Sequence, residues 1–222
     1  MEVYAGFLTH TDHHVGRLLD HLAETGDLDN TIVVVLSDNG ASPEGGPNGA
    51  YNSIRWYNQH PLTLESVLEN LDVLGSPEAH GHYPYGWAHA GNTPFQKWKR
   101  ECHEGGVADP LIVHWPAGIA DRGAVRTQYL HAIDIMPTVL DAIGIEMPDV
   151  VDGVPQKPIE GMSLLDSFGD AASPTERTTQ YYELLGCRAI YHDGWKAVAY
   201  HPMRGQLYIC LLYTSDAADD TP

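Results

Sequence analysis

Residues 31–40 read Thr31-Ile32-Val33-Val34-Val35-Leu36-Ser37-Asp38-Asn39-Gly40, and the character of the chain changes at Ser37. The first six residues form an unbroken apolar and β-branched run, which is typical of a strand covered on both faces. The last four are small or polar and favour a loop. The stretch therefore predicts a buried strand that ends in a polar loop, and the carboxyl ends of strands are where α/β folds place their sites.

Helices and strands alternate on both sides of this stretch. Before it, apolar residues at spacings of three and four predict a helix that ends near Gly26. After it, the patterns predict loops over 41–57, 75–98 and 148–158, helices over 62–74 and 134–143, strands over 110–116 and 129–133, and a hairpin over 188–198. The two longer loops adjoin strand ends, and loops of that length in a compact domain usually have a function.

The order of these elements indicates the fold class. Strands that alternate with helices predict an α/β fold whose sheet is largely parallel, followed by a small antiparallel hairpin region. We place the α/β domain at residues 1–170 and the start of the antiparallel subdomain at residues 171–209. Residues 210–222 resemble the translation of a sequencing adaptor, so we expect a non-native tail there.

Composition narrows the class of protein. The 222 residues are 43% apolar and 19% charged, as in an ordinary globular chain. Their net charge of −18 argues against nucleic acid and against an anionic membrane as partners. No apolar run approaches the roughly 18 residues of a membrane span. The three cysteines are too widely spaced for a disulfide framework or a zinc pattern.

Two short segments carry residues suited to chemistry. Asp38 and Asn39 follow the predicted strand, and their oxygens suit Ca²⁺ or Mg²⁺ better than zinc. The same residues also form ordinary turns. Lys99 precedes the segment His103-Glu104-Gly105-Gly106, although an isolated lysine is normally a solvated surface charge.

The motifs gain meaning when they are taken in order along the chain. They are Ser-Asp-Asn-Gly-Ala-Ser at 37–42, Asn-Thr-Pro-Phe at 92–95, His-Glu-Gly-Gly at 103–106, Pro-Leu-Ile-Val-His-Trp-Pro at 110–116 and Asp-Ile-Met-Pro-Thr-Val-Leu-Asp at 134–141. From Met1 to about Pro202 this order resembles the arylsulfatases, which are sulfatases of the alkaline-phosphatase superfamily. The resemblance implies part of an alkaline-phosphatase-like mixed sheet with flanking helices, plus the C-terminal antiparallel hairpin region.

The resemblance also implies roles for individual residues. Asp38 and Asn39 match the pair that binds the active-site Ca²⁺, with Mg²⁺ as the other possible ion, and Lys99 matches the lysine that contacts the sulfate. Lys97 is the rival, but the spacing of five residues to Glu104 favours Lys99. His89 is a candidate to line the substrate entrance. The implied partner is a small-molecule or carbohydrate sulfate ester, and the implied location is periplasmic or secreted.

The residue at position 39 separates sulfatases from their relatives. Phosphoesterases of the superfamily that use two zinc ions typically place histidine there, and histidine is the better zinc ligand. Asn39 therefore favours sulfate over phosphate. Two alternatives stay open: a phosphoesterase of the same superfamily, and a non-catalytic module that binds Ca²⁺ or carbohydrate.

One part of the family pattern is absent from this sequence. Its nucleophile is a formylglycine made from the cysteine of Cys-x-(Pro/Ser)-x-Arg, and neither Cys102 nor Cys187 begins such a motif. We therefore expect the chain to be the C-terminal part of a sulfatase, inactive alone, with the formylglycine and the remaining metal ligands in a missing N-terminal half. Histidines on the first helix, such as His13, His14 and His21, are expected to be structural or solvated.

Overall fold

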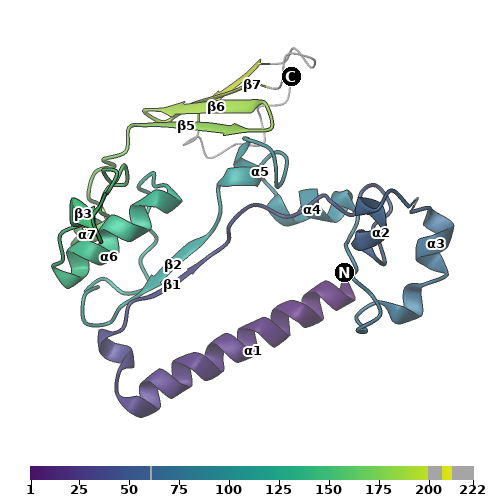
Figure 1. Ribbon diagram of the computed structural model, residues 1–222, viewed down its shortest axis with the longest axis horizontal. Coiled ribbons are helices and arrows are strands. Elements are labelled where there is room, and N and C mark those ends of the chain that lie inside the picture. Colours follow the sequence, from purple (N-terminus) through teal and green to yellow (C-terminus); the bar gives the residue numbers. More distant parts are fainter. Residues whose placement is uncertain (61, 200–206, 212–222) are drawn as a thin grey trace.

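The computed structural model describes residues 1–60, 62–199 and 207–211. Figure 1 shows a long helix, α1 (Glu2–Thr25), along one side of an open arrangement. The strand pair β1 (Val33–Leu36) and β2 (Leu111–His114) lies between α1 and a sheet near the C-terminus. Of the described helices, none is long and apolar enough to cross a membrane.

Helix α1 has the length that the apolar spacing predicts. It ends at Gly26, whose left-handed φ of 81° lets its N–H bond the carbonyl of Ala23. No residue of α1 is buried, and Phe7 on its apolar face is 65% exposed. In the described part of the chain the apolar stripe is therefore largely uncovered, apart from Tyr4, whose ring stands edge-on to Tyr83 at 5.2 Å between centroids.

Strands β1 and β2 pair antiparallel, with Val33 opposite His114 and Leu36 opposite Leu111. The strands predicted at 31–36 and 110–116 are confirmed with shorter bounds. The prediction of a largely parallel sheet is wrong for the described residues, because every described strand pair is antiparallel. An apolar run has the same pattern in either direction, so the sequence could not give the polarity of this pair.

The coverage expected for β1 is not observed either. Val35 and Leu36 remain 44% and 46% exposed, and Ile112 on β2 is 62% exposed. In the part of the chain that the structure describes, no helix buries these side chains.

Residues 41–98 contain more helix than the loop predictions allowed. The first loop closes with a short helix, α2 (Ser53–Tyr57), and the second contains α4 (Tyr85–Asn92). The expected helix over 62–74 is divided into α3 (Leu64–Leu68) and a 3-10 turn at Leu71–Val73. Helix α4 was missed because its two glycines resemble loop composition, whereas Pro84 before it is a favourable start signal.

The strand expected at 129–133 is wrong. This segment is extended and then enters a 3-10 turn at Ala132–Asp134, followed by helix α6 (Ile135–Ile143). The N–H of His131 bonds the carboxylate of Asp134 at 2.7 Å, so it serves a helix cap instead of a strand ladder. Helix α6 ends at Gly144 with φ of 69°, as predicted.

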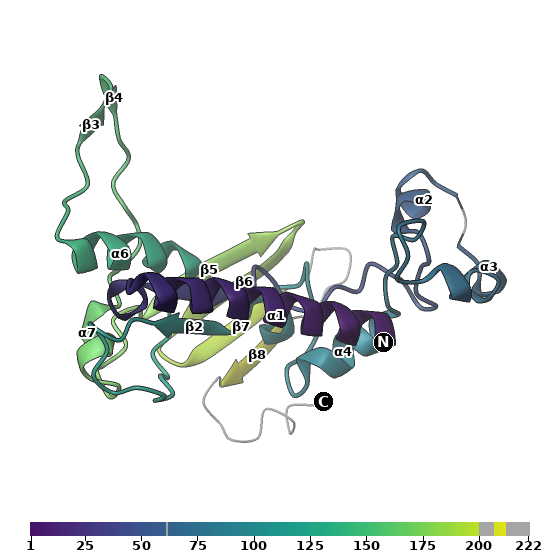
Figure 2. The same ribbon diagram turned by 90° about the horizontal axis from the view of Figure 1, so that it is seen from below.

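The connection after α6 is a long excursion. The loop expected at 148–158 includes a short hairpin whose two strands, β3 (Val150–Val151) and β4 (Val154–Pro155), have two residues each. This hairpin projects away from α6 (Figure 2). Helix α7 (Leu165–Gly169) follows and brings Phe168 into a buried position against Trp115.

The C-terminal sheet has four antiparallel strands in the order β5-β6-β7-β8. Their bounds are β5 Thr179–Leu184, β6 Cys187–His192, β7 Trp195–Ala199 and β8 Leu207–Leu211. The predicted hairpin turn at Asp193-Gly194 is confirmed, with positive φ at both residues, as hairpin turns require. The inward face of the sheet forms a small core with the segment before α5 (Glu104–Val107), made of Cys102, Cys187, Ala189 and Val198 with Tyr182.

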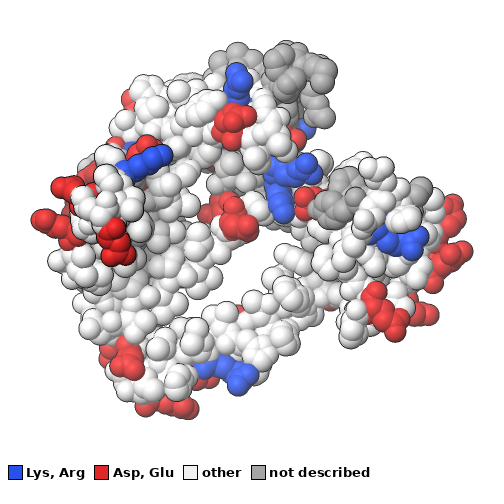
Figure 3. Space-filling model, viewed as in Figure 1, with Lys and Arg blue, Asp and Glu red and all other residues white. Residues whose placement is uncertain are grey.

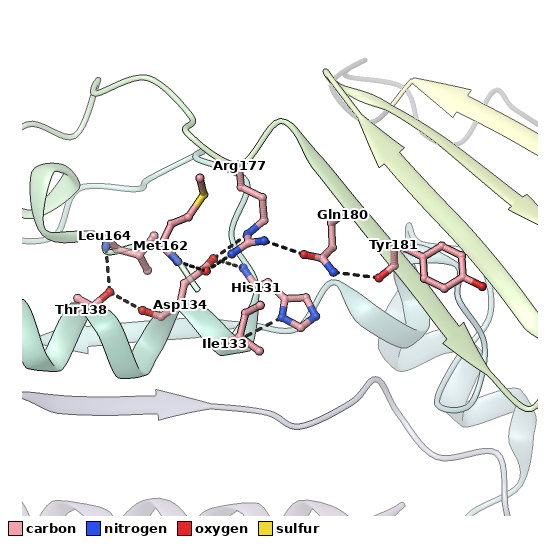
Figure 4. Close-up of polar contacts among 9 residues, drawn as sticks. All are labelled: His131, Ile133, Asp134, Thr138, Met162, Leu164, Arg177, Gln180 and Tyr181. Carbon is pink, nitrogen blue, oxygen red and sulfur yellow. Dashed lines mark hydrogen bonds and ion pairs between the residues drawn. The ribbon is translucent and has the colours of Figure 1, made fainter. Parts of the chain in front are cut away.

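A buried ion pair joins α6 to the segment before this sheet (Figure 4). Asp134 is 1% exposed and accepts hydrogen bonds from Arg177 Nε at 3.0 Å and from the Met162 N–H at 2.8 Å. Arg177 also donates to Gln180 at 2.8 Å. Burial alone would raise the pKa of Asp134, but these donors lower it, so the carboxylate stays ionised.

The boundary at residue 170 stays a prediction. Cys210 and Leu211 are the first residues of the expected non-native tail. They lie in β8, where they pair with Lys196 and Trp195 of β7. The rest of that tail lies outside the described residues.

Candidate active site

Three backbone segments meet at the carboxyl end of β1. They are 37–41, 96–99 and 104–106. The N–H of Gly40 bonds the carbonyl of Gly106 at 3.4 Å, and the N–H of Lys99 bonds the carbonyl of Ala41 at 3.1 Å. A Cβ at Gly40 would lie 1.7 Å from the carbonyl oxygen of Gly105, so only glycine fits this approach. The polar loop after β1 is therefore packed directly on the Glu-Gly-Gly segment.

Asp38 faces a cavity of about 1110 Å³ that Glu104 and Asp109 also line. Burial raises the pKa of Asp109 to about 6, and the negative charges of Asp38 and Glu104 add to this shift. The carboxylates of Asp38 and Glu104 thus lie close enough to disfavour a negative charge on Asp109. A cation bound near Asp109 would offset this effect.

Asn39 is half-buried beside Asp38. Its Nδ2 donates to the carbonyl of Gly40 at 3.0 Å, which leaves Oδ1 as the amide atom suited to a cation. Among the described residues, no group of three or more histidine, cysteine, aspartate or glutamate side chains is placed to hold a metal ion. Asp38 and Asn39 could therefore supply only part of the six to eight oxygens that Ca²⁺ requires.

The two candidate lysines have different surroundings. Lys99 has a side chain 33% exposed, and its Nζ lies 3.3 Å from Glu44 Oε2. Burial acts to raise the pKa of Glu44, but the hydroxyl of Ser42 and the Lys99 ammonium lower it. Lys97 has a left-handed φ of 67°, and its charge lowers the pKa of His103. The structure thus holds the Lys99 backbone against the Asp38 loop and its ammonium at Glu44.

His89 lies on helix α4, so its placement in a loop is wrong. Its side chain is exposed, and its ring stands edge-on to Trp98 with centroids 6.1 Å apart. Trp98 lies between Lys97 and Lys99, so His89 neighbours the lysine segment without contacting Asp38 in any described interaction. His13, His14 and His21 are exposed on α1, as expected for solvated residues.

Cys102 and Cys187 have a structural role. Cys102 and Cys187 are buried, and the Cys102 N–H lies 3.3 Å from Cys187 Sγ. Burial raises the pKa of Cys102 to about 12, with a further contribution from Cys187, so its thiol is not activated.

Two residues at the junction escaped the sequence analysis. Asn92 closes α4 and hydrogen-bonds all three segments. Its motif, Asn-Thr-Pro-Phe, was recognised without a role for the asparagine. Lys196 is fully buried and pairs with Glu104. The register of the predicted hairpin could have indicated this burial. Lys196 stands directly opposite the buried Tyr191, so the two side chains lie on the same face of the sheet.

Charge is distributed unevenly over the molecule. On the face shown in Figure 3, acidic side chains lie at both ends of the molecule, and basic groups are fewer. A sulfate or other anionic ligand would therefore depend on local positive charge rather than on the overall field.

Comparison with known families identifies the family of the chain. The sulfatase family model matches residues 1–145, and the model for the C-terminal region of N-sulphoglucosamine sulphohydrolase matches residues 95–203. The chain therefore belongs to the sulfatase family.

Particular relatives show how much of such a protein the chain represents. It is 32% identical to an uncharacterized sulfatase of Schizosaccharomyces pombe over 214 residues, which cover 92% of the chain and 36% of the relative. It is 28% identical to an arylsulfatase of Klebsiella aerogenes, covering 84% of the chain and 37% of the relative. The chain thus spans about a third of the length of these two relatives.

Solved structures confirm the fold. One, with a TM-score of 0.57 and 21% identity over 92% of the chain and 32% of its own length, holds its substrate D-glucosamine-2-N,6-O-disulfate. Another, from work on glycosaminoglycan metabolism by Bacteroides thetaiotaomicron, has a TM-score of 0.60 and 17% identity over 95% of the chain and 38% of its own length. The α/β class with an alkaline-phosphatase-like fold is therefore confirmed.

Proposed function

We propose that this chain contributes part of the active site of a sulfuric ester hydrolase that acts on a sulfated carbohydrate. The observation that carries the proposal is the match of residues 1–145 to the sulfatase family, together with the convergence of the Asp38, Lys99 and Glu104 segments at one strand end. A sulfated glucosamine as substrate of one structural relative supports the carbohydrate class.

Asp38 and Asn39 are proposed to bind Ca²⁺, or Mg²⁺ in its place. A carboxylate beside an amide oxygen is a donor set for a hard cation, and the negative charges that raise the pKa of the nearby Asp109 favour a positive ion there. Such an ion would withdraw charge from the sulfuryl oxygens when bound.

Lys99 is proposed to hold a sulfate oxygen. Its backbone is hydrogen-bonded to Ala41, and its side chain is one third exposed, so the ammonium can leave Glu44 and bind an anionic substrate. Charge that develops on the sulfuryl group during cleavage would be stabilised by this ammonium in a pocket with little water. His89 is proposed to stand near the entrance to the same segment.

The nucleophile is proposed to lie outside this chain. No cysteine of the sequence begins Cys-x-(Pro/Ser)-x-Arg, the motif that becomes formylglycine in the resembled family. We therefore propose that the 222 residues alone do not hydrolyse sulfate esters, because covalent catalysis needs that group. A periplasmic or secreted location is proposed on the same resemblance.

The test compares the full-length gene product with sulfate and phosphate substrates. Purified protein should hydrolyse p-nitrophenyl sulfate and a 6-sulfated glucosamine, lose this activity in a chelator and regain it with Ca²⁺. Faster hydrolysis of p-nitrophenyl phosphate would favour the phosphoesterase alternative. Ca²⁺ or carbohydrate binding with no hydrolysis of either ester would favour the non-catalytic module.

A further inference from the structure

The side-chain amide of Asn92 forms hydrogen bonds with three separate backbone segments. Its Oδ1 accepts from the Ala41 N–H at 3.1 Å, and its Nδ2 donates to the carbonyls of Lys97 at 2.9 Å and Gly105 at 2.8 Å. The residue is half-buried at the end of α4, and its three partners are up to 64 residues apart along the chain. Such a junction fixes the relative position of segments that are distant in sequence.

Each segment carries one of the candidate functional groups. Ala41 follows the Asp38-Asn39 pair, Lys97 precedes Lys99 by two residues, and Gly105 follows Glu104 directly. Further backbone bonds connect the segments, from the Lys99 N–H to Ala41 at 3.1 Å and from the Gly105 N–H to Gln96 at 2.9 Å. The amide of Asn92 is therefore at the centre of the network.

The chemistry of the junction requires a short side-chain amide. Its three partners are one donor and two acceptors, and only asparagine and glutamine side chains offer one acceptor and two donors. A glutamine would carry its amide one methylene farther from the backbone and out of register with partners that Asn92 reaches at 2.8 to 3.1 Å. An aspartate would set a carboxylate against two carbonyl oxygens.

We infer that Asn92 is a positioning residue that sets the cation-binding loop and the sulfate-binding lysine in register, so that its loss weakens both functions together. The inference rests on the proposed function of Asp38, Asn39 and Lys99. Loss of a group that orients ligands typically lowers metal affinity about 10–100-fold. A displacement of about 1 Å at a reacting centre lowers turnover on the order of 100-fold.

The experiment uses Asn92→Asp in the full-length gene product, with Asn70→Asp as the matched control. Asn70 Nδ2 donates to Ser66 at 2.8 Å in a segment away from the junction, so the control makes the same chemical change elsewhere. Ca²⁺ affinity is measured by titration, kcat/KM with p-nitrophenyl sulfate, and local opening by hydrogen exchange at the Ala41, Lys99 and Gly105 amides. Asn92→Ser, whose hydroxyl can donate one bond, is measured if the aspartate variant fails to fold.

The expected result for Asn92→Asp is faster exchange at all three amides, Ca²⁺ affinity lower by about 10-fold or more, and kcat/KM lower on the order of 100-fold. Lys99→Ala should instead lower kcat/KM and leave Ca²⁺ affinity unchanged. The serine variant should fall between wild type and Asn92→Asp, and Asn70→Asp should match wild type in all three measurements. A merely structural role would lower the melting temperature and leave Ca²⁺ affinity and kcat/KM unchanged below it.

Two outcomes would overturn the inference. One is wild-type exchange at the three amides, and the other is faster exchange with Ca²⁺ affinity and kcat/KM both unchanged. A wild-type protein without Ca²⁺-dependent sulfatase activity would instead disprove the proposed function. The exchange data would then still decide whether Asn92 holds the three segments together.

Discussion

The ammonium of Lys196 on β7 forms an ion pair with the carboxylate of Glu104 at the start of α5. Lys196 is fully buried, and its Nζ also lies 4.9 Å from the ring centre of Tyr182. The pair connects the C-terminal sheet to the Glu-Gly-Gly segment. That segment is in turn hydrogen-bonded to the loop of Asp38, through Gly106 and Gly40. The C-terminal sheet therefore helps to hold the candidate site in place through this ion pair.

Replacing Lys196 by methionine should destabilise the protein strongly. The methionine keeps the apolar stem but leaves the Glu104 carboxylate largely buried without its partner, and breaking a buried ion pair typically costs about 3–5 kcal/mol. Urea unfolding of the full-length gene product measures this loss in the free energy of unfolding. The double variant Lys196→Met with Glu104→Gln should recover part of it, and a double variant no more stable than the single one would contradict the explanation.

The sequence predicted the elements whose signals are local. The amphipathic α1 and its Gly26 terminus, the apolar strands β1 and β2, and the hairpin turn at Asp193-Gly194 are all encoded in short windows. The antiparallel pairing of β1 with β2 is not local, because the paired residues Leu36 and Leu111 are 75 positions apart in the sequence. Helix α4 was hidden by its glycines.

The candidate site shows the same limit. Motif order identified Asp38, Asn39 and Lys99, since these residues keep fixed spacings from their neighbours. Asn92 and Lys196 act through partners distant in sequence, at Ala41 and Glu104, and a composition or spacing rule does not detect such contacts. The roles of Asp38, Asn39, Lys99 and His89 stay predictions.

Asp38→Ala should remove Ca²⁺ from the full-length gene product and abolish turnover, because an anionic ligand is lost from a hard-cation site. Asn39→Ala should have a smaller effect, since it removes a neutral oxygen. Metal analysis after dialysis measures both. Full Ca²⁺ occupancy in the Asp38→Ala protein would disprove the assignment.

Lys99→Ala should lower kcat/KM for a sulfate ester by about 10²–10³-fold, which is the usual effect of losing one preorganised charge donor. Lys97→Ala is the matched control and should have a much smaller effect, since in the structure Lys97 contributes its backbone carbonyl to Asn92. Steady-state kinetics with p-nitrophenyl sulfate give both values. A larger loss for Lys97→Ala would mean that the two lysines exchange roles.

His103 should make the stability of the protein depend on pH between about 6.5 and 4. Its side chain is buried, and burial followed by the charges of Lys97 and Lys196 lowers its pKa to about 4. In this window the unfolded chain binds a proton that the folded chain does not, so the stabilisation is fully present above the unfolded pKa and is lost as pH falls toward 4.

Urea unfolding at pH 7.5, 6 and 5 should show the free energy of unfolding falling faster for wild type than for His103→Gln, which carries no titrating group. The exposed His13 provides the control, because His13→Gln should keep the wild-type slope. Equal slopes for wild type and His103→Gln would show that His103 is not the group responsible.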